Sequence, residues 1–284
     1  MSFIFLLWAK FAGTNLNDAD RWIPLPLGLS FQPSEFAKAA VILFLTWQIQ
    51  GSKKTTAGFW FMCRTMLTLL PIVGLVGSNN LSTAIIILGI GVILIFISDP
   101  GYARFIGMGV TGAAVIAVFL AAESYRLERL AIWRNPEKYE KGFQTIQGLY
   151  AIGSGGLFGR GFGSSLQKLG FVPEAQNDMI FSIVCEETGI LGAFLTLFLF
   201  GILIWRLCIL ALNCRDLQGT LLCAGIMAHM AIQVVLNVAV VTNTIPNTGI
   251  TLPFVSYGGT SVVFLLGEMG LALSVSSHRH GRIT

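Results

Sequence analysis

Long apolar runs separated by short polar segments dominate the chain. A helix that crosses the hydrocarbon core of a bilayer needs about 20 apolar residues. Seven windows meet or nearly meet this length, at residues 35–50, 58–76, 81–98, 105–122, 179–204, 219–241 and 261–277. The pattern predicts an all-α fold, namely a polytopic transmembrane helical bundle with seven full spans.

A further apolar stretch covers residues 2–13 and is too short to span a bilayer alone. The polar residues from Thr14 to Asp20 follow it directly. We therefore expect a partial N-terminal helix, and we expect that the chain lacks its true N-terminus or begins late. No basic segment precedes the stretch and no clear cleavage site follows it, so no cleavable signal peptide is expected.

Composition supports a membrane protein. Hydrophobic residues make up 54% of the 284 residues and charged residues 11%, and the mean hydropathy is +0.75. Soluble domains carry roughly 25% charged residues. These values argue against a soluble globule, a disordered chain, a coiled coil and a disulfide-stapled secreted domain. None of the five cysteines forms a CxxC pair, so we interpret them as small buried hydrophobic residues.

The placement of basic residues predicts the orientation of the spans. Loops on one side contain Lys53, Lys54, Arg104, Arg206, Arg215, Arg279 and Arg282. The short loops 77–83 and 242–260, on the other side, contain no Lys or Arg. By the positive-inside rule the first side, with the C-terminus, is cytoplasmic, and residues 123–178 form one long extracytoplasmic loop. We find no internal repeat and expect a single membrane domain over residues 1–284.

Glu35 and Lys38 lie three residues apart and therefore share one helix face. Pro33 bars regular helix before it and Ser34 can cap the helix that follows, which places the pair near the outer membrane surface. Charges at that depth are costly unless they are paired. Two interpretations stay open: a helix-stabilising ion pair, or a buried pair that shapes a substrate cavity.

Arg126 and Arg129 share a face if the helix of window 105–122 continues through them. Paired arginines suit a phosphate or pyrophosphate, because each guanidinium can donate two parallel hydrogen bonds. The alternative is anchoring at the membrane interface together with Tyr125 and Trp133. The residues alone favour neither interpretation.

Six glycines fall between residues 153 and 163. A nucleotide-binding loop needs a preceding strand and a particular glycine spacing, and the sequence offers neither. We expect an irregular loop that packs tightly on the membrane surface.

Asp178 lies at the aqueous start of the window 179–204. Aspartate is a favoured N-cap, and the helix dipole stabilises its charge. From spacing alone we interpret Asp178 as a cap with a depressed pKa, which would make it a weaker base. Glu186 and Glu187 lie further inside the helix, where a carboxylate needs a partner.

His229, Gln233 and Asn237 recur every four residues and form one polar stripe on the window 219–241. Hydrogen bonding between helices explains such a stripe without catalysis. His229 has no Cys, His or Asp at metal-ligand spacing, so we expect no zinc site and no dedicated metal site. Glu268, in the last window, needs an internal partner.

Residues 245–261 contain two prolines and three glycines, which break any helix, so we expect an outer re-entrant or surface loop. Ser256 in this loop lacks the sequence context of a nucleophile elbow. The residues therefore predict a polytopic protein with an outward-facing polar site, and do not specify its chemistry.

Six sequence motifs occur in one order along the chain: RWI…FQPSEFAK, NNLSTA, RLERL…NPE, QTIQGLYAIGSGGLFGRGFGSSLQKLGFVPEAQNDMIF, EETG and TGITLPFVSYGGTS. Together they resemble the SEDS family (shape, elongation, division and sporulation) of FtsW, RodA and SpoVE proteins. The resemblance extends over residues 20–277 and is stronger for the FtsW/SpoVE branch than for RodA. The family begins with two further helices and a complete third, which this chain lacks.

The resemblance implies a peptidoglycan glycosyltransferase of the bacterial cytoplasmic membrane. Such proteins polymerise lipid II, a disaccharide-peptide on undecaprenyl pyrophosphate, at the outer face of the membrane during cell division or sporulation. The implied partners are a class B penicillin-binding transpeptidase and other divisome membrane proteins, with no nucleic acid. A divalent cation, Mg or Mn, stays open as a cofactor.

The resemblance also implies roles for particular residues. The family's catalytic carboxylate is the Asp of a PE-x-x-x-D motif, which Asp178 matches, although Gln176 and Asn177 depart from the commonest residues between. The candidate substrate-binding residues are Arg126, Arg129, Lys38, Glu35, Lys168 and Ser256. Two other functions stay open: a lipid II flippase, which the intramembrane polar residues would suit, and a non-catalytic division scaffold.

Overall fold

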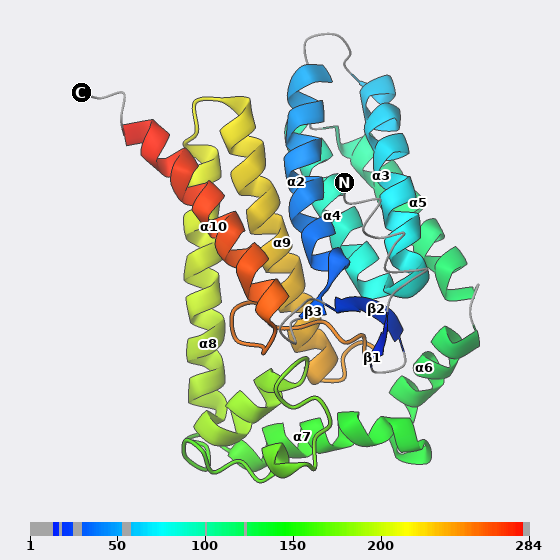
Figure 1. Cartoon of the computed structure of the whole chain (residues 1–284), viewed down its shortest axis with the longest axis vertical. Coiled ribbons are helices and arrows are strands. Elements are labelled where there is room, and N and C mark those ends of the chain that lie inside the picture. The colour runs from blue at the N-terminus through cyan, green and yellow to red at the C-terminus, as the bar shows by residue number, and fades with distance from the viewer. Residues whose placement is uncertain are drawn as a thin grey trace. The chain divides into compact units, whose positions relative to one another are not determined.

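The computed structural model describes residues 14–16, 19–24, 30–52, 58–99, 101–121 and 124–280. Its helices are α2 (Pro33–Ser52), α3 (Phe59–Asn79), α4 (Leu81–Ser98), α5 (Tyr102–Ala121), α6 (Ser124–Arg134), α7 (Phe143–Gly155), α8 (Ile180–Leu212), α9 (Leu217–Val241) and α10 (Gly259–His280) (Figure 1). Three short 3₁₀ helices lie at Pro136–Lys138, Glu140–Gly142 and Gln167–Leu169.

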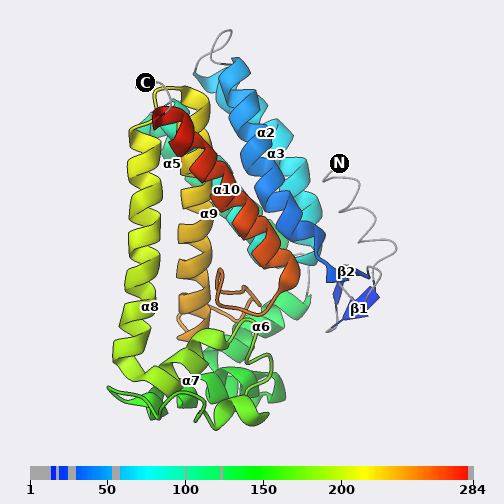
Figure 2. The ribbon, with the colours of Figure 1, turned by 60° about the vertical axis from the view of Figure 1, so that its left-hand side comes forward.

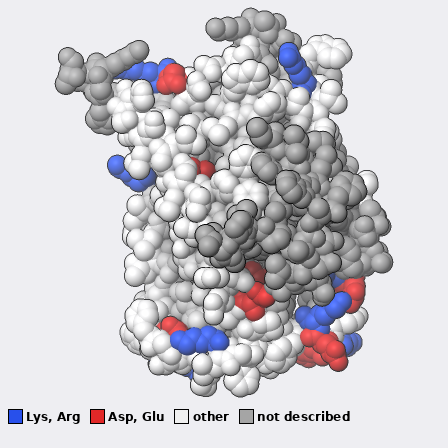
Figure 3. All heavy atoms as spheres, viewed as in Figure 1, with Lys and Arg blue, Asp and Glu red and all other residues white. Residues whose placement is uncertain are grey.

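Each of the seven apolar windows lies on a helix, which confirms the all-α class. Within the described residues, five stretches are long and apolar enough to cross a membrane: Trp60–Ser78, Leu81–Ser98, Ile180–Leu212, Leu217–Val241 and Gly259–His278. The count of seven full spans stays a prediction, and the partial helix expected at residues 2–13 lies outside the described residues. On the face shown in Figure 3, most of the described surface is uncharged, and the Lys, Arg, Asp and Glu residues lie in a few small groups, as a bilayer requires.

Three short strands precede α2 and were not predicted from the sequence. They are β1 (Thr14–Leu16), β2 (Ala19–Pro24) and β3 (Ser30–Phe31), and they pair antiparallel in the order β1-β2-β3. Strands this short carry no readable alternation of apolar and polar residues, which is why the sequence pattern did not reveal them.

The chain divides into two compact units. The first comprises residues 1–119, 205–232 and 259–284, and the second comprises residues 120–204 and 233–258. In the first unit α4 packs against α2 and α3. Gly91 makes this packing close, because a Cβ there would lie 2.3 Å from Leu69 Cδ2. Asn80 caps α4 by accepting a hydrogen bond from the backbone N–H of Thr83 at 3.2 Å.

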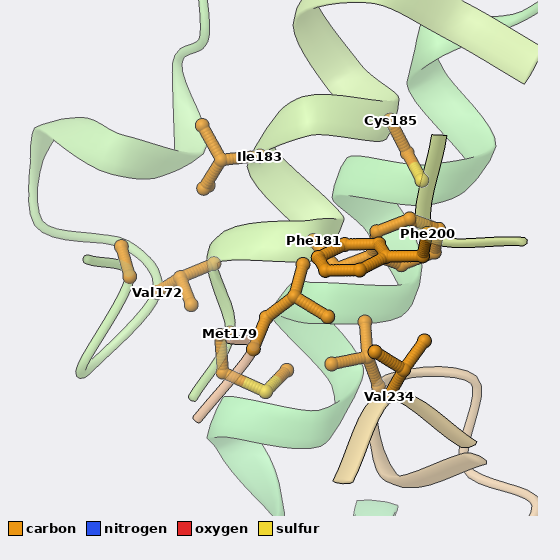
Figure 4. Packing of buried hydrophobic residues seen from close by; sticks show 10 residues of the cluster. Val172, Met179, Phe181, Ile183, Cys185, Phe200 and Val234 are labelled. Atoms are coloured by element: carbon orange, nitrogen blue, oxygen red, sulfur yellow. The ribbon is translucent and has the colours of Figure 1, made fainter. Parts of the chain in front are cut away.

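The second unit has its own apolar core around the start of α8. Ten buried residues form it: Val172, Ala175, Met179, Phe181, Ile183, Cys185, Phe200, Val234, Val241 and Leu252 (Figure 4). Helix α7 approaches this core through glycines. A Cβ at Gly148 would lie 2.2 Å from Met179 Cε, and one at Gly155 would lie 2.0 Å from the Cys185 carbonyl oxygen. The core therefore fixes the chain immediately after Asp178.

Helix α8 breaks at Gly189, whose φ of 68° and ψ of −167° are not helical. The glycine-rich loop fills the break. The N–H groups of Arg160 and Gly161 donate to the carbonyls of Glu186 and Glu187, each at 2.9 Å. Beyond the break, the N–H of Ile190 donates to the Gly156 carbonyl at 2.9 Å and that of Leu191 donates to Leu157 at 3.3 Å. The loop thus satisfies backbone groups that a helix end leaves unpaired.

Candidate active site

Asp178 lies two residues before α8 and is 7% exposed. Asn237 of α9 holds the backbone beside it, since its Nδ2 donates to the Asp178 carbonyl at 2.9 Å and to the Ile250 carbonyl at 2.7 Å. Gly249 lies next to the carboxylate, because a Cβ there would be 3.9 Å from Asp178 Oδ2. One amide thus ties together α9, the start of α8 and the loop 242–258.

The Asp178 carboxylate is the end of a chain of polar contacts. Gln144 of α7 donates from Nε2 to Asp178 Oδ1 at 3.3 Å and to the Pro173 carbonyl at 3.3 Å. Asn247 Nδ2 donates to Gln144 Oε1 at 3.0 Å. Arg129 of α6 donates from Nη1 to the Asn247 carbonyl at 3.4 Å. The contacts connect a candidate pyrophosphate-binding arginine with the candidate base.

Burial raises the pKa of Asp178 to about 7, because the charged carboxylate loses hydration. The nearby Glu174 carboxylate raises this pKa further, whereas the backbone N–H groups of Asp178 and Met179 and the Arg129 guanidinium oppose the rise. The expectation of a depressed pKa was wrong. It assumed that an N-cap position dominates, but Asp178 precedes the helix and the loss of water outweighs its backbone donors.

The loop 242–258 is fastened to the segment before Asp178. Ser256 Oγ donates to the Asn177 carbonyl at 2.6 Å and accepts from the Leu252 N–H at 2.7 Å, and the Tyr257 N–H donates to the Gln176 carbonyl at 2.8 Å. On the same loop, Thr251 accepts from Gln233 Nε2 at 3.0 Å. The hydroxyl group of Ser256 therefore holds the loop in place, because it donates its hydrogen bond to the Asn177 carbonyl.

Arg126 and Arg129 both lie on α6, whereas the window 105–122 lies on α5, and that the two arginines share a face stays a prediction. Arg129 is exposed, and the side chain of Arg126 lies outside the described atoms. Trp133 of the same helix donates from Nε1 to the Asn243 carbonyl at 2.9 Å. This contact holds α6 to the loop 242–258.

The carboxylates of Glu186 and Glu187 have the partners that their position requires. Ser165 Oγ donates to Glu186 at 2.5 Å, and Arg160 Nη1 lies 3.6 Å from Glu186. Lys168 Nζ lies 2.6 Å from Glu187 Oε1. Lys168, a candidate substrate-binding residue, is thus engaged with Glu187.

The first unit contains two buried ionisable pairs. Lys38 Nζ lies 2.9 Å from Glu35 Oε1, with side chains 2% and 8% exposed, which confirms the pairing expected from their spacing. His229 Nδ1 lies 2.8 Å from Glu268 Oε2, so Glu268 has the internal partner that we expected from the sequence. That Glu35 and Lys38 contact the same substrate as Asp178 stays a prediction.

Sequence reasoning missed Gln144 and Asn247. Neutral amides carry no signal in a charge pattern, and the two lie 103 residues apart in the chain. Gln144 stands at the start of the QTIQGLYAIG motif, which is the one clue that could have directed attention to it. Among the described residues, no three His, Cys, Asp or Glu side chains form a group that could hold a metal ion.

Comparison with known proteins identifies the family. A family model described as "Cell cycle protein", of FtsW, RodA and SpoVE, matches residues 1–281. The chain belongs to this family. With its apolar helices, it is therefore a membrane-embedded protein.

Two curated relatives illustrate the similarity. Stage V sporulation protein E of Bacillus subtilis is 39% identical over 272 residues, which cover 92% of this chain and 72% of the relative. The probable peptidoglycan glycosyltransferase FtsW of Trichlorobacter lovleyi is 35% identical over 271 residues, which cover 93% of this chain and 70% of the relative. Both values agree with the predicted likeness to the FtsW/SpoVE branch.

Two solved structures share the fold of this family member. A chain from a peptidoglycan synthase complex that coordinates polymerization and crosslinking matches with a TM-score of 0.79 and 30% identity, over 96% of this chain and 77% of the other. RodA of Thermus thermophilus matches with a TM-score of 0.68 and 28% identity, over 96% and 74% of the respective chains.

Proposed function

We propose that this chain is a peptidoglycan glycosyltransferase that polymerises lipid II at the outer face of the cytoplasmic membrane, with Asp178 as the general base. Relatives at 32–35% identity carry the name probable peptidoglycan glycosyltransferase. The observation that carries the role of Asp178 is the burial of its carboxylate beside the Gln144 amide, because burial raises the pKa of Asp178 to about 7. A base works best when its pKa lies near the operating pH.

The reaction is a single displacement. The carboxylate of Asp178 accepts the proton of the acceptor sugar's 4-hydroxyl as that oxygen attacks the anomeric carbon of the donor glycan. A new C–O bond forms, the bond between the anomeric carbon and the pyrophosphate oxygen breaks, and undecaprenyl pyrophosphate leaves with the electron pair. One displacement inverts the anomeric centre. A base of this kind contributes roughly 10²–10⁴ to the rate.

We assign the departing pyrophosphate to Arg126 and Arg129 on α6. Guanidinium groups bind phosphate oxygens with two parallel hydrogen bonds and stabilise the charge that develops on the leaving group. The contact from Arg129 to the Asn247 carbonyl, and from Asn247 to Gln144, supports this assignment, because it couples the leaving-group side of the reaction to the base.

Four further residues belong to the proposal with different roles. Glu35 and Lys38 form a buried ion pair, and we propose that they line the substrate cavity. Lys168 is already paired with Glu187, and Ser256 already donates a hydrogen bond to the Asn177 carbonyl. Contact with substrate would require each to exchange its partner, so we propose that these two residues hold the loops that shape the site.

The proposed partner is a class B penicillin-binding transpeptidase, which crosslinks the strands that this chain would polymerise. The match to a chain of a peptidoglycan synthase complex supports it. The proposal also places residues 123–178 outside the cell and the C-terminus inside, on the basis of the positive-inside rule. The role in division or sporulation follows the relatives' names.

The test is reconstitution of the chain with the transpeptidase in proteoliposomes that contain purified lipid II. Electrophoresis of labelled glycan strands measures polymerisation, and a fluorescent lipid II reporter measures transfer between leaflets in the same vesicles. The proposal predicts strands in the presence of the chain and no acceleration of leaflet transfer. Transfer without strands would favour the flippase, and neither activity with intact partner binding would favour the scaffold.

A further inference from the structure

The break at Gly189 separates two parts of α8, and the second part is long enough to cross a membrane by itself. Residues 190–212 follow it as helix, and at about 1.5 Å per residue they extend over roughly 34 Å. This length matches a hydrocarbon core of roughly 30 Å. Large apolar side chains of this part are more than half exposed, among them Ile190, Phe194 and Leu195, as expected for a lipid-facing helix. Gly189 therefore divides the candidate span Ile180–Leu212 into a mostly buried part before it and a part with exposed apolar side chains after it.

The glycine-rich loop lies at the depth of this first turn. The carbonyls of Gly156 and Leu157 accept hydrogen bonds from the N–H groups of Ile190 and Leu191. Because these hydrogen bonds are 2.9 and 3.3 Å long, the glycine-rich loop and the first turn of α8 after the break lie at nearly the same depth. Figures 1 and 2 both show the segment after α7 beside this end of α8. Leu157 thus lies beside the first turn of α8 after the break.

The residues that follow expose apolar surface. Between residues 157 and 171, six large apolar side chains are each more than half exposed: Leu157, Phe158, Phe162, Leu166, Leu169 and Phe171. Phe158 is 79% exposed and Phe162 is 88% exposed. An apolar patch of this kind marks an interaction site, because exposure of the patch to water is unfavourable.

The charges of the same segment are already neutralised. Arg160 lies 3.6 Å from Glu186, and Lys168 lies 2.6 Å from Glu187. Paired charges among exposed Phe and Leu side chains suit the interface of a bilayer, where apolar groups enter the acyl region and polar groups stay near the headgroups.

We propose that residues 157–171, here named the interfacial loop, insert their apolar side chains into the leaflet at the Gly189 end of α8. The lipid bilayer is the occupant of this surface, since the loop continues the lipid-facing side of a span to which it is hydrogen-bonded. The insertion also sets the depth of Asp178, because the Val172 N–H donates to the Gln167 carbonyl at 2.9 Å and Val172 enters the core that holds Met179.

Site-directed fluorescence in lipid nanodiscs tests the proposal on the full chain. The five native cysteines are replaced by alanine, and single substitutions Phe158→Cys, Phe162→Cys and Leu169→Cys carry an environment-sensitive NBD label. Glu137→Cys, in the exposed 3₁₀ turn Pro136–Lys138, is the water-facing control. Leu195→Cys, on the exposed side of α8, is the lipid-facing control.

The expected result is a blue-shifted emission at residues 158, 162 and 169, strong quenching by nitroxide lipids as for the Leu195→Cys label, and loss of quenching by aqueous iodide. Iodide quenching as strong as that of the Glu137→Cys label would overturn the proposal. If the purified transpeptidase then removed that quenching, the surface would be a protein-docking site instead.

A second measurement needs no substitution. A bilayer-confined photoactivatable diazirine is activated in nanodiscs that hold the unsubstituted chain, and the modified peptides are mapped by mass spectrometry. The proposal predicts modification of the interfacial loop and of residues 190–205, with no modification of residues 135–142. An unmodified loop beside a modified α8 would contradict it. Neither readout depends on glycosyltransferase activity. A failure of the insertion proposal would therefore leave the proposed function untouched, and a failure of the proposed function would leave the insertion proposal untouched.

Discussion

Gln144 donates a hydrogen bond from Nε2 to Oδ1 of Asp178 at 3.3 Å, across 34 residues of chain. The orientation of the Gln144 amide is fixed, because its Oε1 accepts from Asn247 Nδ2 at 3.0 Å. Asn247 is fixed in turn by the Gly249 N–H, which donates to its Oδ1 at 3.2 Å. An N–H donor aimed at a carboxylate favours the ionised form, so Gln144 holds Asp178 in the state that a base requires.

We therefore predict that Gln144→Ala slows glycan formation and moves the pH midpoint of kcat/KM upward. The loss of one hydrogen bond to a charged group costs the ionised form about 1.5–3 kcal/mol, which moves the midpoint up by about one to two pH units and lowers the ionised fraction of Asp178 roughly 10- to 100-fold below the midpoint. Strand formation with lipid II, followed over a pH series, measures both effects. Gln147→Ala on the same helix is the matched control, and an equal effect of this control would contradict the assignment.

The pH dependence follows from the raised pKa of Asp178. A general base acts when it is deprotonated, so kcat/KM should rise with pH and reach half its maximum near pH 7. The neighbouring Glu174 carboxylate raises this pKa, so Glu174→Gln should move the midpoint to lower pH. The Arg129 guanidinium lowers it, so Arg129→Gln should move the midpoint to higher pH.

These opposite shifts separate electrostatics from damage to the fold, which would lower the rate without moving the midpoint. The measurement is the pH profile of initial polymerisation rate at low lipid II concentration for the three proteins. Shifts in the same direction for both variants would show that Asp178 is not the titrating group.

Gly189 should tolerate no side chain. Its φ of 68° and ψ of −167° lie in a region accessible essentially to glycine, and a Cβ would meet the Leu157 carbonyl oxygen and the Gly159 nitrogen, both at 2.4 Å. We predict that Gly189→Ala destabilises the fold by at least about 1–3 kcal/mol. Thermal unfolding in detergent checks this. Gly201→Ala, elsewhere on α8 and with open space around it, should leave the Tm unchanged or raise it.

The buried pair of His229 and Glu268 holds α9 to α10 within the first unit. Removing one member leaves an unpaired polar group in an apolar setting, so His229→Leu and Glu268→Leu should each destabilise by about 3–5 kcal/mol. The double variant should recover much of this loss, because it removes both members of the pair together. If the fall in unfolding temperature of the double variant equalled the sum of the falls of the two single variants, the coupling between His229 and Glu268 would be refuted.

The sequence predicted well whatever depends on local periodicity. Apolar windows predicted seven helices because the bilayer fixes both length and hydrophobicity, and the spacing of Glu35 and Lys38 fixed their pairing within one helix. The need of Glu268 for a partner was predictable, whereas the identity of that partner was not, since His229 lies 39 residues away.

Properties that arise from tertiary packing could not be predicted. The sign of the Asp178 pKa shift depends on burial by α7, α9 and the loop 242–258, and the local helix dipole suggested the opposite sign. Gln144 and Asn247 meet only because the fold brings α7 and that loop together. The glycine-rich loop was expected to pack tightly, and its role in satisfying the backbone at Gly189 became evident from the hydrogen bonds.

The most direct test of the account compares the unsubstituted chain with Asp178→Asn at equal amounts of folded protein, each with the transpeptidase and lipid II. Asparagine keeps the size of the side chain and cannot accept the proton. The account predicts a loss of glycan strand formation of about 10²-fold or more, with partner binding and unfolding temperature retained. Undiminished strand formation by Asp178→Asn would contradict it.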